Sequence, residues 1–199
     1  MVSVSTKEVI FLHTIMINGL LSIPKEAQKK LNLPRNPRDY TSIAVTTDDS
    51  NDEIVYASSM GDGVIQYKNG TPVQSYNEKN AFKETAGGYG SGYCYIDGLA
   101  FDKNGNLWMT SSEVNHAVLV LDKAGAWHRL DIEQLRGVYT INDILITSTN
   151  DKWIYVPRNT PKLVMIPNSE SLDEVSSYEF TTLIDTDGKE LTPSNYTCV

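Results

Sequence analysis

Short apolar segments alternate with turn residues along this chain of 199 residues, and they predict an all-β fold that is a fragment of a β-propeller. Two spacings support this prediction. Trp108 and Trp153 hold the same place in successive units and lie 45 residues apart, and Leu99 and Ile144 have the same spacing. A period of roughly 40–55 residues with four strands in each unit is typical of propeller blades. An immunoglobulin-like sandwich does not predict an aromatic residue at the same place in two units.

The clearest unit covers residues 98–130. Its turns carry residues that tolerate a positive φ angle, Asn104 with Gly105 and then Gly125, as tight hairpins require. The apolar segments between these turns have the length of strands in one antiparallel blade. The expected strands are residues 98–101, 107–110, 117–121 and 126–130.

The same order of strands and turns precedes and follows that unit. A polar turn over 46–53 and a hairpin at Asn69 and Gly70 separate the strands of the first unit. In the third unit a turn over 147–151 precedes a strand over 152–156, and a last strand is expected over 178–184. The predicted organisation is an N-terminal segment 1–40 of strands, a helix and a linker, a candidate partial blade, followed by blades over 41–199, at 41–85, 96–137, 140–192 and the start of another at 194–199.

These units amount to about three to four blades of four-stranded antiparallel sheet. A closed propeller needs at least four blades, because an open one leaves sheet edges and apolar faces uncovered. We therefore expect the chain to be part of a larger propeller; the alternatives are that the first 40 residues complete a small assembly, or that the chain associates with itself through its unclosed blades.

Composition narrows the classes of partner. Hydrophobic residues make up 40% and charged residues 21%, which predicts a globular fold rather than disorder. The formal net charge is −8, and the largest basic cluster is the pair Lys29 and Lys30. An acidic surface repels phosphates, so we expect no nucleic-acid partner.

The apolar run over residues 9–23 is too short to span a bilayer and lacks a small-residue cleavage site, so we predict buried strands there and no membrane span in this chain. If the protein is exported, its signal sequence is expected outside this chain. The cysteines Cys94 and Cys198 have no spacing suited to zinc, and the sequence leaves open whether they are paired. The histidines have no metal-binding spacing either, and no cofactor or metal is predicted.

Residues 102–113 imitate a calcium loop, with Asp102, Asn104 and Asn106 at its first, third and fifth positions and Glu113 at its twelfth. Leu107 stands where such a loop needs glycine, and the flanking segments are strands rather than helices. The segment is therefore better interpreted as the hairpin of a repeat.

A glycine-rich segment over residues 87–93 connects the first two units. It lacks the lysine and the helix that a phosphate-binding loop needs, so we interpret it as an inter-blade loop. Loops of a propeller carry its ligand contacts, and aromatic rings stack on the apolar faces of sugars. The predicted ligand-binding residues are Tyr89, Tyr93, Tyr95 and the partly exposed Trp127, and no catalytic residue is predicted.

Two patterns in these repeats resemble a known family. Residues 102–109, DKNGNLWM, resemble the motif of two-component-regulator propeller repeats, which occur in periplasmic sensor regions of Bacteroidetes hybrid histidine kinases. The order of motifs over 42–81, then 96–112, then a strand with Gly125, Trp127 and His128, resembles PorZ-type propellers of type IX secretion. The resemblance covers about residues 38–199, departs over 1–33, and lacks the Asp-x-x-Gly turn in the third unit, which has Ser-Thr-Asn-Asp at 148–151.

The resemblance implies a non-enzymatic binding or scaffold module at the cell surface or in the periplasm. Its implied partners are carbohydrate, lipopolysaccharide or other envelope proteins. Two alternatives stay open: a ligand-sensing propeller of a hybrid two-component regulator that recognises a glycan, and, less favoured, a propeller hydrolase or lyase.

Overall fold

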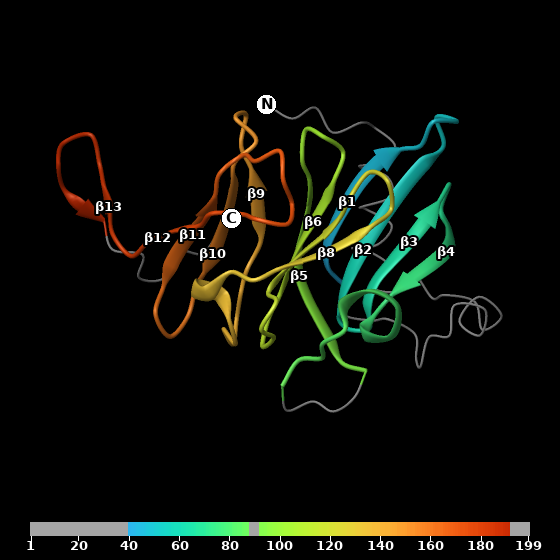
Figure 1. Cartoon of the computed structure of the whole chain (residues 1–199), viewed down its shortest axis with the longest axis horizontal. Coiled ribbons are helices and arrows are strands. Elements are labelled where there is room, and N and C mark those ends of the chain that lie inside the picture. Colours follow the sequence, from blue (N-terminus) through green and yellow to red (C-terminus); the bar gives the residue numbers. More distant parts are fainter. Residues whose placement is uncertain (1–39, 88–91, 192–199) are drawn as a thin grey trace.

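The computed structural model describes residues 40–87 and 92–191, which form three successive antiparallel sheets followed by a small hairpin (Figure 1). Each has its strands in sequence order, as in a propeller blade. Residues 60–61 pair with residues 94–95, so the first two four-stranded units are joined at one end into a continuous eight-stranded sheet; we treat them as the first and second sheets. The predictions for residues 1–39, for Tyr89, for the start of a further blade at 194–199 and for Cys198 lie outside the described residues.

The three sheets have four strands each. The first contains β1 (Tyr40–Thr47), β2 (Glu53–Gly61), β3 (Gly63–Lys68) and β4 (Thr71–Tyr76), followed by η1 (Glu78–Phe82). The second contains β5 (Cys94–Phe101), β6 (Leu107–Ser111), β7 (Val118–Leu121) and β8 (Trp127–Leu130), followed by η2 (Glu133–Leu135). The third contains β9 (Ile144–Ile146), β10 (Lys152–Val156), β11 (Lys162–Ile166) and β12 (Tyr178–Phe180). The predicted fold class, an all-β propeller fragment with four-stranded blades, is confirmed.

The prediction of one long strand over 178–184 is wrong in detail. β12 ends at Phe180, and a separate hairpin of β13 (Leu183–Ile184) and β14 (Glu190–Leu191) follows it. The turn between them closes because Gly188 has a φ of +79° and Asp185 accepts backbone hydrogen bonds from Asp187 and Lys189. Figure 1 shows this hairpin projecting at one end of the molecule.

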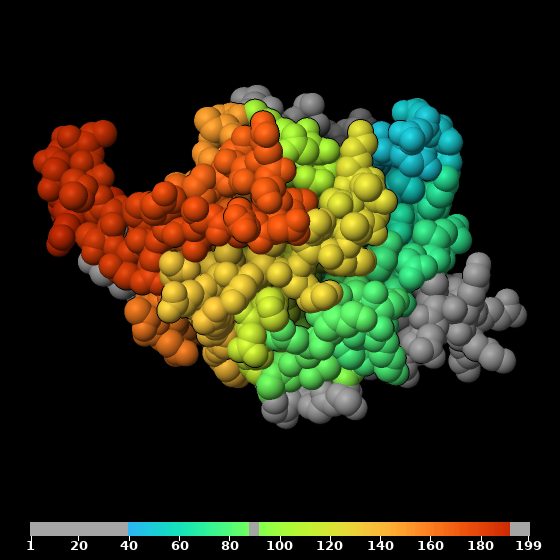
Figure 2. All heavy atoms as spheres, in the orientation of Figure 1, coloured from blue at the N-terminus to red at the C-terminus, as the bar shows by residue number. Residues whose placement is uncertain are grey.

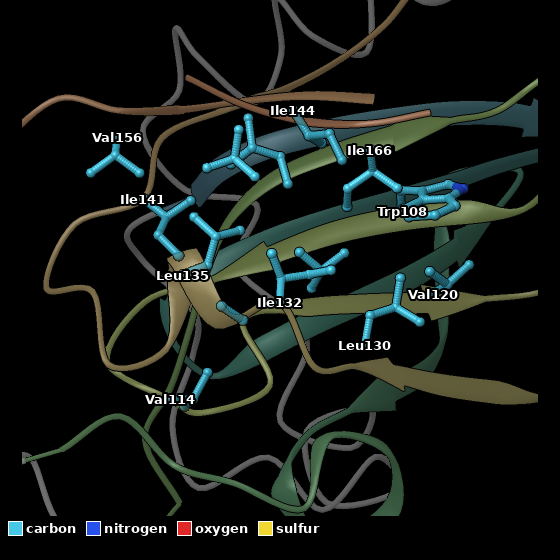
Figure 3. Close-up of a cluster of buried hydrophobic side chains, with 14 residues drawn as sticks. Trp108, Val114, Val120, Leu130, Ile132, Leu135, Ile141, Ile144, Val156 and Ile166 are labelled. Atoms are coloured by element: carbon cyan, nitrogen blue, oxygen red, sulfur yellow. The ribbon is translucent and has the colours of Figure 1, made fainter. Parts of the chain in front are cut away.

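Alternating residues of each strand pack against the neighbouring sheets. On β6, Leu107 and Met109 contribute to the core between the first two sheets, whereas Trp108 contributes to the core between the second and third. Figure 3 shows this second core, in which Trp108 lies beside Ile166 and Val120. Successive side chains of a strand point to opposite faces of the sheet, and both faces of β6 and β7 are covered by neighbouring sheets. The residues of these two strands are therefore buried.

The hairpin turns of the three sheets share one geometry. In each, a side-chain oxygen of the first turn residue accepts a hydrogen bond from the backbone N–H four residues later. The pairs are Asp48 with Asp52 at 2.9 Å, Asp102 with Asn106 at 2.9 Å, and Thr147 with Asp151 at 3.0 Å. The fourth turn residue has a positive φ in all three turns: Asn51, Gly105 and Asn150. The third unit therefore makes the blade turn without the Asp-x-x-Gly motif, because Thr147 and Asn150 supply the same acceptor and the same backbone conformation.

Asp102 is the hub of the central turn. Its carboxylate accepts hydrogen bonds from the backbone N–H groups of Asn104 and Asn106, from the side-chain amide of Asn106, and from Trp108 Nε1 at 3.0 Å. Lys152 Nζ lies 3.9 Å from the same carboxylate and 4.5 Å from the centre of the Trp108 ring. Protein donors thus occupy the oxygens that the calcium interpretation would have required.

Candidate functional site

Three connections meet at the end of the molecule where β5 begins. Hydrogen bonds join them: Gly87 N donates to Glu113 O at 3.4 Å, Ser112 N to Tyr95 O at 3.1 Å, and Glu113 N to Val138 O at 2.8 Å. We call this surface the loop face; it consists of residues 84–87, 92–97, 112–117 and 131–143, and lies along the lower edge of Figure 1. Because loops from two inter-blade connections meet there, side chains far apart in sequence become neighbours.

Three tyrosines, Tyr93, Tyr95 and Tyr139, belong to the loop face. Burial raises the pKa of the Tyr95 hydroxyl, and the nearby carboxyl groups of Asp97 and Glu113 raise it further. Tyr93 and Tyr95 are half-buried, whereas Tyr139 is 54% exposed. The structure therefore places two of the predicted ligand-binding residues, Tyr93 and Tyr95, on the same loop face as Tyr139.

Sequence reasoning missed Tyr139. It follows Gly137, a residue with a φ of +64°, in the connection between the second and third sheets. That connection is equivalent to the one that carries Tyr93, so a tyrosine in each of the two inter-blade connections, ahead of β5 and β9, was the signal that could have found it.

Trp127 lies apart from this group, on β8. Its ring packs edge to face against Tyr76, with ring centres 5.2 Å apart, and against Phe82, at 5.5 Å. These neighbours place it in the packing between the first two sheets. Tyr89 lies outside the described residues.

Carboxyl groups accompany the tyrosines. Asp97 Oδ2 accepts a hydrogen bond of 2.7 Å from the hydroxyl of Ser112, which in turn accepts one from Ile141 N. Burial raises the pKa of Asp97 to about 7, with a smaller contribution from the negative charge of Asp143. Partial burial also raises the pKa of Asp143, whose carboxylate accepts a hydrogen bond from Ile144 N. Near neutral pH, Asp97 can therefore both donate and accept hydrogen bonds.

Glu113 is held next to this group in a conformation that non-glycine residues seldom adopt, with a φ of +62°. Among the described residues, no donor reaches its buried Oε1 atom. A buried acceptor without a donor costs free energy, so Glu113 is a strained and poorly satisfied point of the loop face.

Other polar groups connect the loops to one another. Glu84 forms an ion pair with His116 and accepts a hydrogen bond from Asn115 N at 2.7 Å. Cys94 is buried under the loop face, and burial raises the pKa of its thiol to about 12. The thiol is therefore protonated at neutral pH and is a poor nucleophile. Among residues 40–87 and 92–191, His, Cys, Asp and Glu side chains form no group of three that could hold a metal ion.

We expect stability to depend on pH through Asp97. Its pKa in the folded chain, about 7, lies above the ordinary value of 3.8, so the folded state keeps a proton that the unfolded state loses. Stability is therefore expected to fall as the pH rises from about 4 to about 7 and to level off above that range. Asp97→Asn should raise the free energy of unfolding at pH 8 by about 2 kcal/mol relative to the parent chain and change little at pH 4. Urea unfolding at both pH values measures this difference, and an equal effect at the two would refute the assignment.

No family model and no curated protein sequence matches this chain. Solved structures do. PorZ, a bacterial surface component of the type-IX secretion system of Porphyromonas gingivalis, is 18% identical with a TM-score of 0.66, over 84% of this chain and 23% of that chain. The extracellular domain of BT4673 from B. thetaiotaomicron, described as a one-component system, is 14% identical with a TM-score of 0.53, over 74% of this chain and 19% of that chain. A second structure of that domain, described as a hybrid two-component system, has a TM-score of 0.51 at 14% identity, over 73% of this chain and 19% of that chain.

These similarities show the fold. The resemblance to PorZ-type and sensor propellers, predicted from the repeat motifs, is confirmed at that level, and the three sheets are propeller blades. The chain spans less than a quarter of the length of each of these proteins. In the part of the chain that is described, no helix has the length and apolar character needed to cross a bilayer.

Proposed function

We propose that this chain is a non-enzymatic binding or scaffold module of an exported or cell-envelope β-propeller protein, PorZ-like in character, that binds a carbohydrate at its loop face. The observation that carries this proposal is the presence of Tyr93, Tyr95 and Tyr139 on one loop face together with the carboxyl group of Asp97, which Ser112 holds by a hydrogen bond. Flat rings offer apolar faces to sugar rings, and neighbouring carboxyl groups hydrogen-bond to sugar hydroxyls.

The charge of the loop face favours uncharged sugar units. Asp97, Asp143, Glu113 and Glu84 all lie on or beside it. Anionic groups such as the phosphates of a lipopolysaccharide would be repelled there, whereas neutral sugars of its polysaccharide would not. A cell-surface or periplasmic location fits such a ligand and accords with the locations stated for PorZ and for the BT4673 domain.

A glycan-sensing domain of a two-component regulator is the second candidate, favoured by the similarity of fold to the extracellular domain of BT4673. The two differ in ligand size. A sensor responds to short oligosaccharides, whereas an envelope scaffold binds a long polysaccharide or another envelope protein. Self-association through unclosed blades also stays a prediction; Leu145, on the third sheet, is 65% exposed.

Replacement of Tyr95 tests the proposal. Tyr95→Ala is expected to weaken binding of the polysaccharide prepared from purified lipopolysaccharide by about five- to tenfold, since stacking on one ring contributes on the order of 1 kcal/mol. Biolayer interferometry with immobilised chain measures this change. Tyr178→Ala is the control, because Tyr178 is an exposed tyrosine on β12, away from the loop face.

Three outcomes are informative. Equal loss in both variants, or no binding by the parent chain, would contradict a carbohydrate site at the loop face. Binding of short oligosaccharides in preference to the polysaccharide would support the sensor candidate. Release of new reducing ends during incubation would overturn the non-enzymatic part, because a carboxyl group with a pKa near 7, such as Asp97, also suits a general acid.

A further inference from the structure

A cleft opens at the end of β5 and β6 that is opposite to the loop face. It lies between the first and second sheets, has a volume of about 560 Å³, and falls within the range of small-molecule sites. The residues that line the cleft include Tyr56, Gln66, Lys68, Phe101, Asp122 and Lys123. Figure 2 shows the tips of the β1–β2 hairpin (blue) and the β7–β8 hairpin (yellow), which both contribute to this cleft, next to each other.

The interior of the cleft is aromatic and aliphatic. Tyr56 from β2 and Phe101 from β5 lie edge to face, with ring centres 5.9 Å apart and an angle of 70° between the rings. Both are half-buried, so parts of their surfaces face the cleft. Behind them, Tyr56 stacks on Tyr76 at 6.4 Å, and Tyr76 contacts Trp127. This series of rings holds Tyr56 in place and explains the half-buried position of Trp127.

The rim is polar, and its charges are largely compensated. Lys68 Nζ lies 2.7 Å from Asp48 and 2.9 Å from Asp52, and these contacts raise the pKa of Lys68. Asp122 pairs with His128 at 3.0 Å. Gln66 uses its carbonyl oxygen to accept a hydrogen bond from Tyr76, and its amide nitrogen donates to no acceptor within the described residues.

We infer that this cleft is a binding site for a neutral saccharide of one or two rings. The apolar interior of the cleft can pack against the C–H face of a sugar ring. The amide of Gln66 can donate a hydrogen bond to a sugar hydroxyl, and the carboxylate of Asp122 can accept one. A phosphate or carboxylate ligand would need a free cation, but two aspartates already neutralise Lys68, and Lys123 faces a rim that also carries Asp48, Asp49 and Asp122. The excess of aspartates over lysines on the rim therefore repels anionic sugars. A cationic sugar would have to displace existing partners, because Asp48 and Asp52 already pair with Lys68 and Asp122 pairs with His128.

This site is independent of the loop face. β5 separates the two, with Tyr95 near its start and Phe101 at its end. The failure of one site in binding experiments therefore leaves the other intact.

Chemical-shift mapping on the full chain tests the inference. Maltose, cellobiose and lactose, each added to millimolar concentration, are the probes, and glucuronic acid and glucosamine are their charged counterparts. At least one neutral disaccharide is expected to shift backbone amide signals of residues 46–49 and 121–123, with little change for the charged sugars. Phe101→Leu should weaken that binding about three- to tenfold, because it removes the ring face and keeps most of the apolar volume.

Tyr178→Leu is the matched control, since it removes an exposed ring on β12, outside the cleft, and should bind as the parent chain does. The inference is overturned if no neutral disaccharide moves these signals, if the charged sugars move them equally, or if the shifts occur only around residues 93–95. Circular dichroism establishes that Phe101→Leu is folded. If it is not, the mapping on the parent chain, together with Gln66→Ala on the rim, decides the matter.

Discussion

Asp102→Ala is expected to lower the free energy of unfolding by about 3–5 kcal/mol, close to the full stability of many small domains. The side chains of Asp102 and Lys152 are only 1% and 2% exposed, and the carboxylate is the acidic partner of the buried lysine. Its removal leaves the lysine charge without compensation in a site where burial already lowers the pKa of Lys152. It also leaves Trp108 Nε1 without its acceptor and opens the turn of the central blade.

The matched control is Asp122→Ala. Asp122 begins the β7–β8 turn and accepts a hydrogen bond of 2.8 Å from Ala126 N, but its side chain is 21% exposed and its partner His128 is equally accessible to water. That variant should lose only about 1 kcal/mol. Denaturant unfolding followed by circular dichroism compares the two, and losses within 1 kcal/mol of each other would show that the Asp102 site is no more than an ordinary turn.

The double variant Asp102→Ala with Lys152→Met separates the two causes. If the uncompensated charge dominates, replacing the lysine by an apolar residue of similar length should recover part of the loss, because a buried ion pair can be exchanged for apolar packing at little cost. If the lost turn dominates, the double variant should be no more stable than Asp102→Ala.

Much of the fold could be predicted because the repeat is local. The alternation of apolar residues with glycine-containing turns placed β6, β7 and β8 within one residue of their observed bounds, whereas β5 begins at Cys94, four residues before the predicted start at Gly98. The third turn did not match the motif in sequence, yet Thr147 and Asn150 reproduce its acceptor and its positive φ. The blade turn depends on a hydrogen bond and a backbone conformation, and more than one pair of residue types can provide both.

The site was less predictable because it depends on contacts between units. Ser112 and Glu113 reach Ile141 and Val138, and so position Tyr139 near the tyrosines of the first connection, only after the second and third sheets pack together. Trp127 was expected to be partly exposed, and it is half-buried; its packing against Tyr76 could not be foreseen from a single strand. The cleft between the first two sheets arises in the same way, from the ends of strands in two different blades.

Gly63→Ala is the second substitution for which we expect a large loss, about 3 kcal/mol or more. Gly63 begins β3 with a φ of +81°, and a Cβ atom there would lie 2.1 Å from the carbonyl oxygen of Tyr76 and 3.0 Å from the Phe82 ring. The first contact is with backbone, so it cannot be relieved by rotation of a side chain. Relief requires β4 to move away from β3, which breaks hydrogen bonds of the ladder and displaces η1.

Gly70→Ala is the control that separates the cost of the left-handed backbone conformation from the cost of the steric clash at Cβ. Gly70 has a similar φ of +75° in the β3–β4 turn, but nothing lies within 4 Å of the position of its Cβ. That variant carries only the cost of the left-handed conformation, about 1–2 kcal/mol. Thermal unfolding of the two variants measures the difference, which we assign to the close approach of Gly63 and Tyr76. Because Phe82 also contacts Trp127, Gly63→Ala should change the near-ultraviolet circular dichroism of the tryptophans, whereas Gly70→Ala should not. Equal destabilisation by both substitutions would contradict the tight packing of β3 against β4 and η1.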